Sequence, residues 1–136
     1  MYKILVVDDE PELREQLEVI ATGHDRDVLS ASGDKEAIKL IEQHEFNIII
    51  TDLRMGENEM AGIDVLKAAK KKSIHTQVIL VTVYGTPEIS VETMRLGAFD
   101  YLERNTPGTN IVEMLRAKIK LALEFQGATK GKEITS

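Results

Sequence analysis

Five residues with chemically useful side chains stand just after short apolar runs of the sequence. Asp8 and Asp9 follow the first run, Asp52 the third, Thr82 the fourth and Arg104 the fifth. Carboxylate oxygens are hard ligands that favour Mg²⁺, Mn²⁺ or Ca²⁺ over zinc. A carboxylate beside such a metal can attack phosphorus and form an aspartyl phosphate. A hydroxyl and a cation would then stabilise the charge on the transferred group. If these residues meet, the set indicates phosphoryl chemistry.

The apolar runs have the length and composition of β-strands. They are short and rich in β-branched or aromatic residues. The five runs are Ile4–Val7, Val28–Leu29, Phe46–Ile50, Gln77–Val81 and Phe99–Leu102. The first, third and fourth are continuously apolar rather than alternating. That pattern is typical of strands covered on both faces, as in a parallel sheet.

Segments with helical spacing follow each run. They are Pro11–Thr22, a segment that begins at Asp34, a segment that contains Ile63, Leu66 and Ala69, Thr86–Gly97, and Asn110–Phe125. We expect Asp34 and Thr86 to cap their helices. The alternation predicts an α/β fold, a doubly wound parallel sheet with helices on both faces. Function in such a sheet lies outside the carboxyl ends of the strands, where the five residues stand.

The composition narrows the class of protein. The chain has 136 residues, which suits one domain, and we expect residues 1–125 to form it and 126–136 to be a flexible tail or linker stub. The absence of cysteine rules out a disulfide scaffold or a thiol nucleophile. The net charge of −6 argues against direct nucleic-acid binding. Without a membrane span or a signal peptide, we expect a cytoplasmic protein that binds no membrane.

Each chemical signal also has an ordinary structural explanation. Asp8 and Asp9 suit the start of a helix through the helix dipole alone. Asp52 also suits a solvated turn, Thr82 the end of any strand, and Arg104 an exposed surface. Their joint placement at the ends of neighbouring strands is what favours a site.

Four stretches of the sequence together resemble a known family. They are ILVVDDEPELRE, IIITDLRM, VILVTVYGTPE and RLGAFDYLE. Over about residues 2–125 the chain resembles a response-regulator receiver domain, the phosphorylated partner of sensor histidine kinases, and most resembles receivers of sigma-54-dependent activators. The resemblance implies a (βα)5 fold with a five-stranded sheet in the flavodoxin-like order 2-1-3-4-5, flanked by helices in three layers α/β/α.

The resemblance implies a role for each residue of the acidic site. Asp52 is the expected phosphoacceptor, in a Mg²⁺-dependent reaction. Asp8, Asp9 and Asp52 are the expected Mg²⁺ ligands, together with the backbone carbonyl of Arg54. Arg104 takes the place of the cation that contacts the phosphoryl group. No enzymatic activity is expected beyond self-phosphorylation and autodephosphorylation.

The resemblance also implies a switch and partners. Thr82 is expected to turn toward the phosphoryl group, and Tyr101 to swing inward with it. The face of the fourth helix, fifth strand and fifth helix would report the change to an output domain or protein, or form a homodimer. The expected phosphoryl donor is a sensor histidine kinase or a phosphotransfer protein.

The chain departs from the family pattern at three places. Arg104 and Asn105 stand where the family has a lysine and a cis proline, and arginine is a longer, planar, bidentate cation. The segment Gly56–Gly62 is longer and more acidic than the usual loop after the acceptor. Val83 replaces a small residue, and its bulk could narrow access to Asp52. The departures motivate an alternative, a degenerate receiver that binds partners without phosphorylation.

A third interpretation is a flavin- or nucleotide-binding domain of the same architecture. Such a domain has a glycine-rich phosphate loop after its first strand. Here that turn is Asp-Asp-Glu-Pro. The turn would repel a phosphate unless a metal intervened, so this interpretation ranks last.

Overall fold

The computed structural model describes the backbone of residues 1–135 and the side chains of residues 1–126. Five strands form one sheet: β1 (Tyr2–Val7), β2 (Arg26–Ala31), β3 (Ile48–Thr51), β4 (Gln77–Thr82) and β5 (Asp100–Glu103). All neighbouring pairs are parallel, and the strand order is β2-β1-β3-β4-β5. The predicted α/β fold and its 2-1-3-4-5 order are confirmed.

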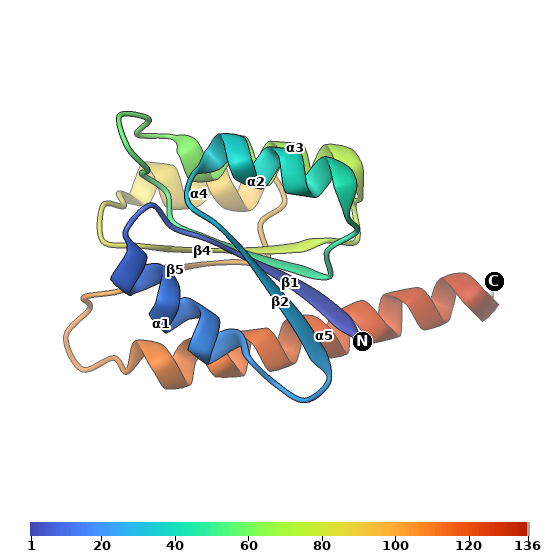
Figure 1. Ribbon diagram of the computed structural model, residues 1–136. Helices are drawn as coiled ribbons and strands as arrows, with labels where there is room; N and C mark the ends of the chain where they lie inside the picture. Colours follow the sequence, from blue (N-terminus) through green and yellow to red (C-terminus); the bar gives the residue numbers. More distant parts are fainter. Residues whose placement is uncertain (136) are drawn as a thin grey trace.

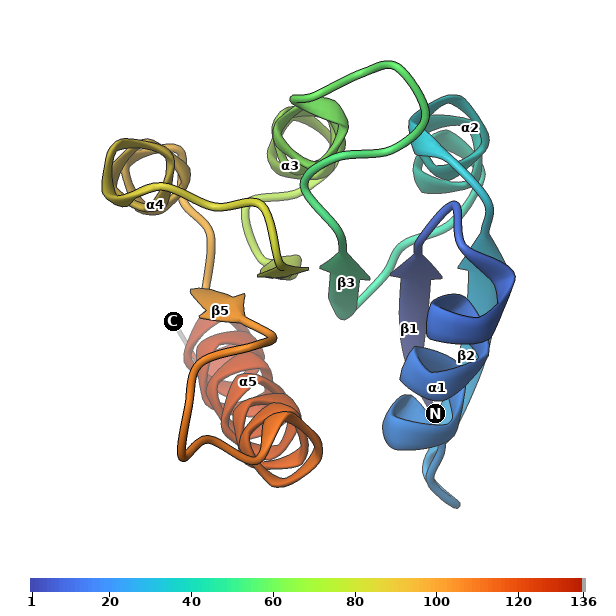
Figure 2. The same cartoon turned by 90° about the vertical axis from the view of Figure 1, so that its left-hand side faces the viewer.

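Helices cover both faces of the sheet. They are α1 (Pro11–Ala21), α2 (Asp34–Gln43), α3 (Ala61–Lys72), α4 (Pro87–Arg95) and α5 (Ile111–Thr135). Helices α1 and α5 lie on one face and α2, α3 and α4 on the other (Figure 1). Figure 2 looks onto the edge at which β1 and β3 end, and the long loop after β3 arches there beside α2 and α3.

The burial of β1 shows why its sequence is apolar at successive positions. Leu5 and Val7 belong to the apolar cluster beneath α2 and α3, whereas Ile4 and Val6 belong to the cluster beneath α1 and α5. All four side chains are fully buried. A strand covered on both faces needs no polar alternation, so the prediction from the continuous runs is confirmed.

The two predicted helix caps had different outcomes. The Thr86 hydroxyl accepts a hydrogen bond from the Ile89 amide at 3.2 Å, and Pro87 opens α4, as predicted. The predicted cap at Asp34 is wrong, because Gly33 is the N-cap and Asp34 is the first residue of α2. The Asp34 carboxylate instead accepts a hydrogen bond from the side chain of Asn58.

The last helix extends past the expected end at Phe125. Helix α5 continues to Thr135, and Gly127 and Gly131 lie within it. A glycine costs only about 1 kcal/mol in a helix interior, and no proline interrupts this segment. Helical backbone therefore continues into the segment expected to be a tail, whereas the boundary between domain and tail stays a prediction.

Within the described part of the chain, no helix is both long and apolar enough to cross a membrane.

Candidate functional site

The strand register brings four of the predicted residues to one edge of the sheet. Val7 pairs with Thr51, so Asp8 and Asp52 leave adjacent strands at the same level. Thr82 closes β4 and pairs with Glu103, which precedes Arg104. The Arg104 amide donates to the Thr82 carbonyl at 3.0 Å. The sequence pattern placed these residues at strand ends, and the parallel sheet makes them neighbours.

Asp8 is a buried acid whose carboxylate is only partly satisfied. Its Oδ1 accepts a hydrogen bond from the Glu10 amide at 3.0 Å, whereas its Oδ2 is buried without a hydrogen-bond partner. Burial raises the pKa of Asp8 to about 6, and the negative charges of Asp52 and Asp9 add to the rise. The Glu10 hydrogen bond and the Arg104 cation oppose it. A bound cation would therefore stabilise the ionised form of Asp8.

Asp52 is buried at the end of β3 but is held by several donors. Its Oδ1 accepts from the Leu53 amide at 2.7 Å. Burial raises the pKa of Asp52, while hydrogen bonds from the Thr82 hydroxyl and the amides of Leu53 and Arg54 lower it. The donors fix the carboxylate in one orientation, which suits a nucleophile that must meet phosphorus from one direction.

Asp9 lies at the same edge, and its carboxylate contacts the loop after β3. Its Oδ2 accepts a hydrogen bond from the Gly56 amide at 2.7 Å. Arg54 directs its side chain elsewhere, with the guanidinium 4.9 Å from the centre of the Tyr84 ring. That cation–π contact leaves the role predicted for the Arg54 carbonyl untouched.

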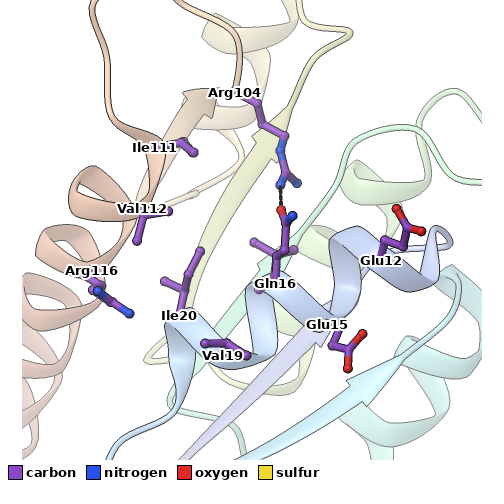
Figure 3. A pocket seen from close by; sticks show the side chains of 10 residues that line it. Glu12, Glu15, Gln16, Val19, Ile20, Arg104, Ile111, Val112 and Arg116 are labelled. Atoms are coloured by element: carbon purple, nitrogen blue, oxygen red, sulfur yellow. Dashed lines mark hydrogen bonds between the residues drawn. The ribbon is translucent and has the colours of Figure 1, made fainter.

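Arg104 reaches into the acidic site from the end of β5. Its Nη1 lies 3.9 Å from the unpartnered Oδ2 of Asp8, and its side chain is only 10% exposed. Its Nη2 donates to Oε1 of Gln16 in α1 at 3.5 Å, the contact drawn in Figure 3. Arg104 is thus an interior cation rather than a surface one. It also borders a groove of about 680 Å³ between α1 and α5.

The residues of this edge fit a partly hydrated magnesium ion better than a closed metal cage. Among the described residues, no group of three or more Asp, Glu, His or Cys side chains is spaced to hold a metal on its own. Mg²⁺ commonly takes one or two carboxylates and keeps several waters. The buried, unpartnered Oδ2 of Asp8 and the raised pKa of its carboxyl are what such an ion would satisfy. The donor set fits, and the ligand assignment itself stays a prediction.

The two predicted switch residues lie on the neighbouring strands β4 and β5, where Thr82 pairs with Glu103 and Tyr101 pairs with Leu80. The Thr82 Oγ1 accepts a hydrogen bond from the Tyr84 amide at 3.0 Å. The hydroxyl of Tyr101 is buried and has no hydrogen-bond partner. Burial raises the pKa of Tyr101, and so do the charges of Glu103 and Asp52. The ring therefore lies inward in this structure.

Sequence reasoning missed the residue that makes room for this ring. A Cβ added to Gly85 would lie 1.5 Å from the Tyr101 hydroxyl oxygen. Gly85 lies within the VILVTVYGTPE stretch, but no periodicity or motif marks its contact with Tyr101, sixteen residues away.

Val83 is 45% exposed and has its side chain toward solvent.

The raised pKa of Asp8 predicts how stability depends on pH in the absence of divalent metal. The folded pKa of about 6 lies above the ordinary value of 3.8, so the folded state binds the Asp8 proton more tightly. The protonated Asp8 carboxyl stabilises the fold fully at a pH below its unfolded-state pKa of 3.8. This stabilisation is lost as the pH rises through the folded-state pKa of about 6. This pKa shift corresponds to a change of about 3 kcal/mol in the free energy of unfolding.

Denaturant unfolding in EDTA measures this difference. The free energy of unfolding of the wild type should fall relative to that of Asp8→Asn between about pH 4 and pH 7. Asp8→Asn removes the titration at this position while it keeps the shape of the side chain. Parallel pH profiles for the two proteins would contradict the prediction.

The comparisons with known proteins agree with this geometry. The family model described as "Response regulator receiver domain" matches residues 4–116. The chain is 30% identical over 119 residues to the response regulator protein PilR of Pseudomonas aeruginosa, a match that covers 88% of the chain and 26% of PilR. It is 35% identical over 128 residues to the regulatory protein AtoC of Escherichia coli, a match that covers 94% of the chain and 26% of AtoC. The chain thus spans about a quarter of these two relatives.

Solved structures show the same fold. A CheY-like response regulator receiver domain protein from Methanospirillum hungatei is similar with a TM-score of 0.83 and 26% identity, over 95% of this chain and 98% of that one. A response regulator receiver domain protein from Clostridium thermocellum gives a TM-score of 0.81 with 27% identity, over 95% of this chain and 99% of that one.

Proposed function

Because the chain belongs to the response regulator receiver domain family, we propose that it accepts a phosphoryl group on Asp52 in a Mg²⁺-dependent reaction. The proposed donor is a sensor histidine kinase or a phosphotransfer protein. The observation that carries the proposal is the meeting of three groups at one sheet edge. Asp8 and Asp52 leave adjacent strands at the same level, and Nη1 of Arg104 lies 3.9 Å from Oδ2 of Asp8. In this function the chain is a phosphoacceptor rather than an enzyme acting on small molecules. We propose that it acts in the cytoplasm.

The proposed transfer is a displacement at phosphorus. An oxygen of the ionised Asp52 carboxylate forms a bond to phosphorus as the bond from phosphorus to the donor's imidazole nitrogen breaks. That nitrogen keeps the electron pair. The Leu53 amide restricts rotation of the Asp52 carboxylate through its 2.7 Å hydrogen bond to Oδ1, so the attacking oxygen is already oriented.

Mg²⁺, when bound, would neutralise charge on the transferred group and on the acids around it. Asp8, Asp9, Asp52 and the Arg54 carbonyl are the groups that would hold it. Arg104 Nη1 lies 3.9 Å from Oδ2 of Asp8, one of these groups, and its planar fork can donate to two oxygens of one phosphoryl group. Its 3.5 Å contact with Gln16 is long, so little is lost when the guanidinium moves toward that group.

The proposed output surface is the face of α4, β5 and α5. Val91 and Met94 of α4 are 59% and 45% exposed, and Tyr84 just before α4 is 51% exposed. Since α4 packs beside β5, which carries Tyr101, movement of the ring would alter the surface. A downstream output domain, a separate protein or a second copy could bind it, and the similarity to PilR and AtoC supports a receiver of the sigma-54-activator type.

The alternative of a phosphorylation-independent module rests on the departures at Arg104, Asn105 and the long loop. Arg104 nevertheless lies at the acidic site, 3.9 Å from Asp8. The geometry therefore favours the phosphoacceptor.

Treatment with acetyl phosphate tests the proposal directly. In the presence of Mg²⁺ the wild-type chain should gain one phosphoryl group, detected by mass spectrometry of the intact protein. With EDTA in place of Mg²⁺ the gain should disappear. A chain that stays unmodified with acetyl phosphate and with a phosphorylated histidine kinase would contradict the proposal.

Metal binding has its own expected result. Mg²⁺ at about ten times its dissociation constant should stabilise the folded chain by about 1.4 kcal/mol, by mass action. Asp9→Ala should remove the resulting rise in melting temperature, because it deletes one proposed ligand. A rise of unchanged size in Asp9→Ala would place the metal elsewhere.

A further inference from the structure

The loop after β3 contains a tight turn that the proposed function does not use. Met55 and Asn58 form an isolated antiparallel bridge, with both amide-to-carbonyl hydrogen bonds at 3.0 Å. Gly56 lies within the turn at a φ of +58°, a conformation that side-chain-bearing residues rarely adopt. The turn overlaps the segment Gly56–Gly62, which we expect from the sequence to be longer than the usual loop of the family.

The Asn58 side chain ties this turn to two helices. Its Nδ2 donates one hydrogen bond to Oδ2 of Asp34 and another to Oδ2 of Asp64, both at 3.0 Å. Its Oδ1 accepts from the Met60 amide at 3.0 Å. Asp34 opens α2 and Asp64 lies in the first turn of α3. Both amide hydrogens and the amide oxygen are thus used, and hydrogen bonds to carboxylates are the stronger kind.

A neutral amide is the group that this position requires. A carboxylate in place of the Asn58 amide would face two carboxylates with a third negative charge. A serine has only one hydrogen to donate to two acceptors. Asparagine therefore satisfies the hydrogen-bonding groups around position 58, whereas aspartate or serine would not.

The same turn also holds Asp9. The Gly56 amide, two residues before Asn58, donates to Asp9 Oδ2 at 2.7 Å. This contact joins residues that are 47 positions apart in the sequence. It fixes one carboxylate oxygen and leaves the other for a cation.

We propose that Asn58 is a positioning residue that holds the turn 55–58 between α2 and α3, so that the Gly56 amide orients the Asp9 carboxylate for a divalent cation. The inference rests on the proposed function, which makes Asp9 a cation ligand. Hydrogen bonds to a ligating side chain orient it and strengthen metal binding, and their loss commonly weakens affinity by roughly 10–100-fold.

The test compares wild type with Asn58→Ala, a substitution that removes no charge. Magnesium titration followed by calorimetry should show about tenfold weaker binding in Asn58→Ala. Hydrogen exchange at the Gly56 amide, measured by NMR without metal, should be at least about tenfold faster. The global melting temperature in EDTA serves as a check that the variant is folded.

Asn105→Ala is the matched control. It also replaces an asparagine, here an exposed one whereas Asn58 is half-buried, and it leaves the turn 55–58 intact. Its magnesium affinity and its Gly56 exchange rate should equal those of the wild type. In a double-mutant cycle, Asp64→Ala should change Gly56 exchange less in the Asn58→Ala background than in the wild type.

An unchanged magnesium affinity in folded Asn58→Ala would overturn the proposal. A tighter affinity would overturn it too, because it would mean that the turn withholds Asp9, and so would a wild type that binds no Mg²⁺. At saturating Mg²⁺, Asn58→Ala should still be phosphorylated by acetyl phosphate, with only the half-saturating Mg²⁺ concentration raised. Absence of phosphorylation in the wild type, by contrast, would contradict the proposed function.

Discussion

Asn in place of Asp52 is expected to abolish phosphoryl incorporation completely. The substitution removes the anionic oxygen that we propose attacks phosphorus, and it keeps the size of the side chain. Mass spectrometry after acetyl phosphate treatment with Mg²⁺ should therefore show no added phosphoryl group in Asp52→Asn.

The same variant should fold at least as well as the wild type. Burial raises the pKa of Asp52, so the ionised carboxylate opposes folding at neutral pH, and a neutral amide relieves that cost. Thermal unfolding in EDTA should thus give an equal or higher melting temperature. Asp27→Asn, which replaces an exposed acid on β2, is the matched control and should be phosphorylated normally. Modification that survives Asp52→Asn would assign the acceptor to another residue.

The positions of the acidic residues could be predicted because they follow from the alternation of strands and helices. Once the sheet is parallel, Asp8 and Asp52 must leave it at the same edge, and their residue types indicate the chemistry that we propose. The ends of the elements were less predictable. Strand β2 extends from Arg26 to Ala31 rather than over Val28–Leu29 alone, because its pairing with β1 recruits polar residues that no apolar pattern marks.

The contacts between distant segments could not be predicted at all. Asp34 has the residue type of a helix cap, yet its carboxylate accepts from Asn58, and the sequence has no signal for that partner. The charged Arg104 has the pattern of a surface residue, and only the closure of β5 against β4 turns it toward Asp8. Residue type therefore indicates which chemistry to propose for the edge, and tertiary packing determines which groups meet there.

Gly85 and Tyr101 provide the second all-or-none test, because their contact leaves no room for a side chain at position 85. A Cβ on Gly85 would lie 1.5 Å from the Tyr101 hydroxyl oxygen and 2.7 Å from Cζ. Both atoms belong to the far end of a side chain that is only partly buried, so the ring can leave toward solvent. Its buried hydroxyl has no hydrogen-bond partner to lose, and such a group costs about 1–3 kcal/mol where it lies. Gly85→Ala should therefore expel the ring.

The expected consequence is a receiver that is phosphorylated but does not switch. In Gly85→Ala, NMR of the Tyr101 ring should show the outward conformation both with and without beryllofluoride, a phosphoryl mimic. Acetyl phosphate should still modify Asp52, because the donors that orient its carboxylate are unchanged by the substitution. Gly33→Ala is the matched control, since a Cβ there meets no atom within 4 Å. It should leave the Tyr101 signals unchanged.

Removal of the hydroxyl separates the steric cause from other effects of the substitution. Tyr101→Phe deletes the atom 1.5 Å from the added Cβ, but Cζ remains at 2.7 Å. The double variant Gly85→Ala with Tyr101→Phe should therefore recover part of the inward population and not all of it. An inward ring in Gly85→Ala itself would mean that the backbone around Gly85 moves instead. In that case the loop between β4 and α4, rather than the Tyr101 side chain, would be the element that moves to accommodate the added methyl group.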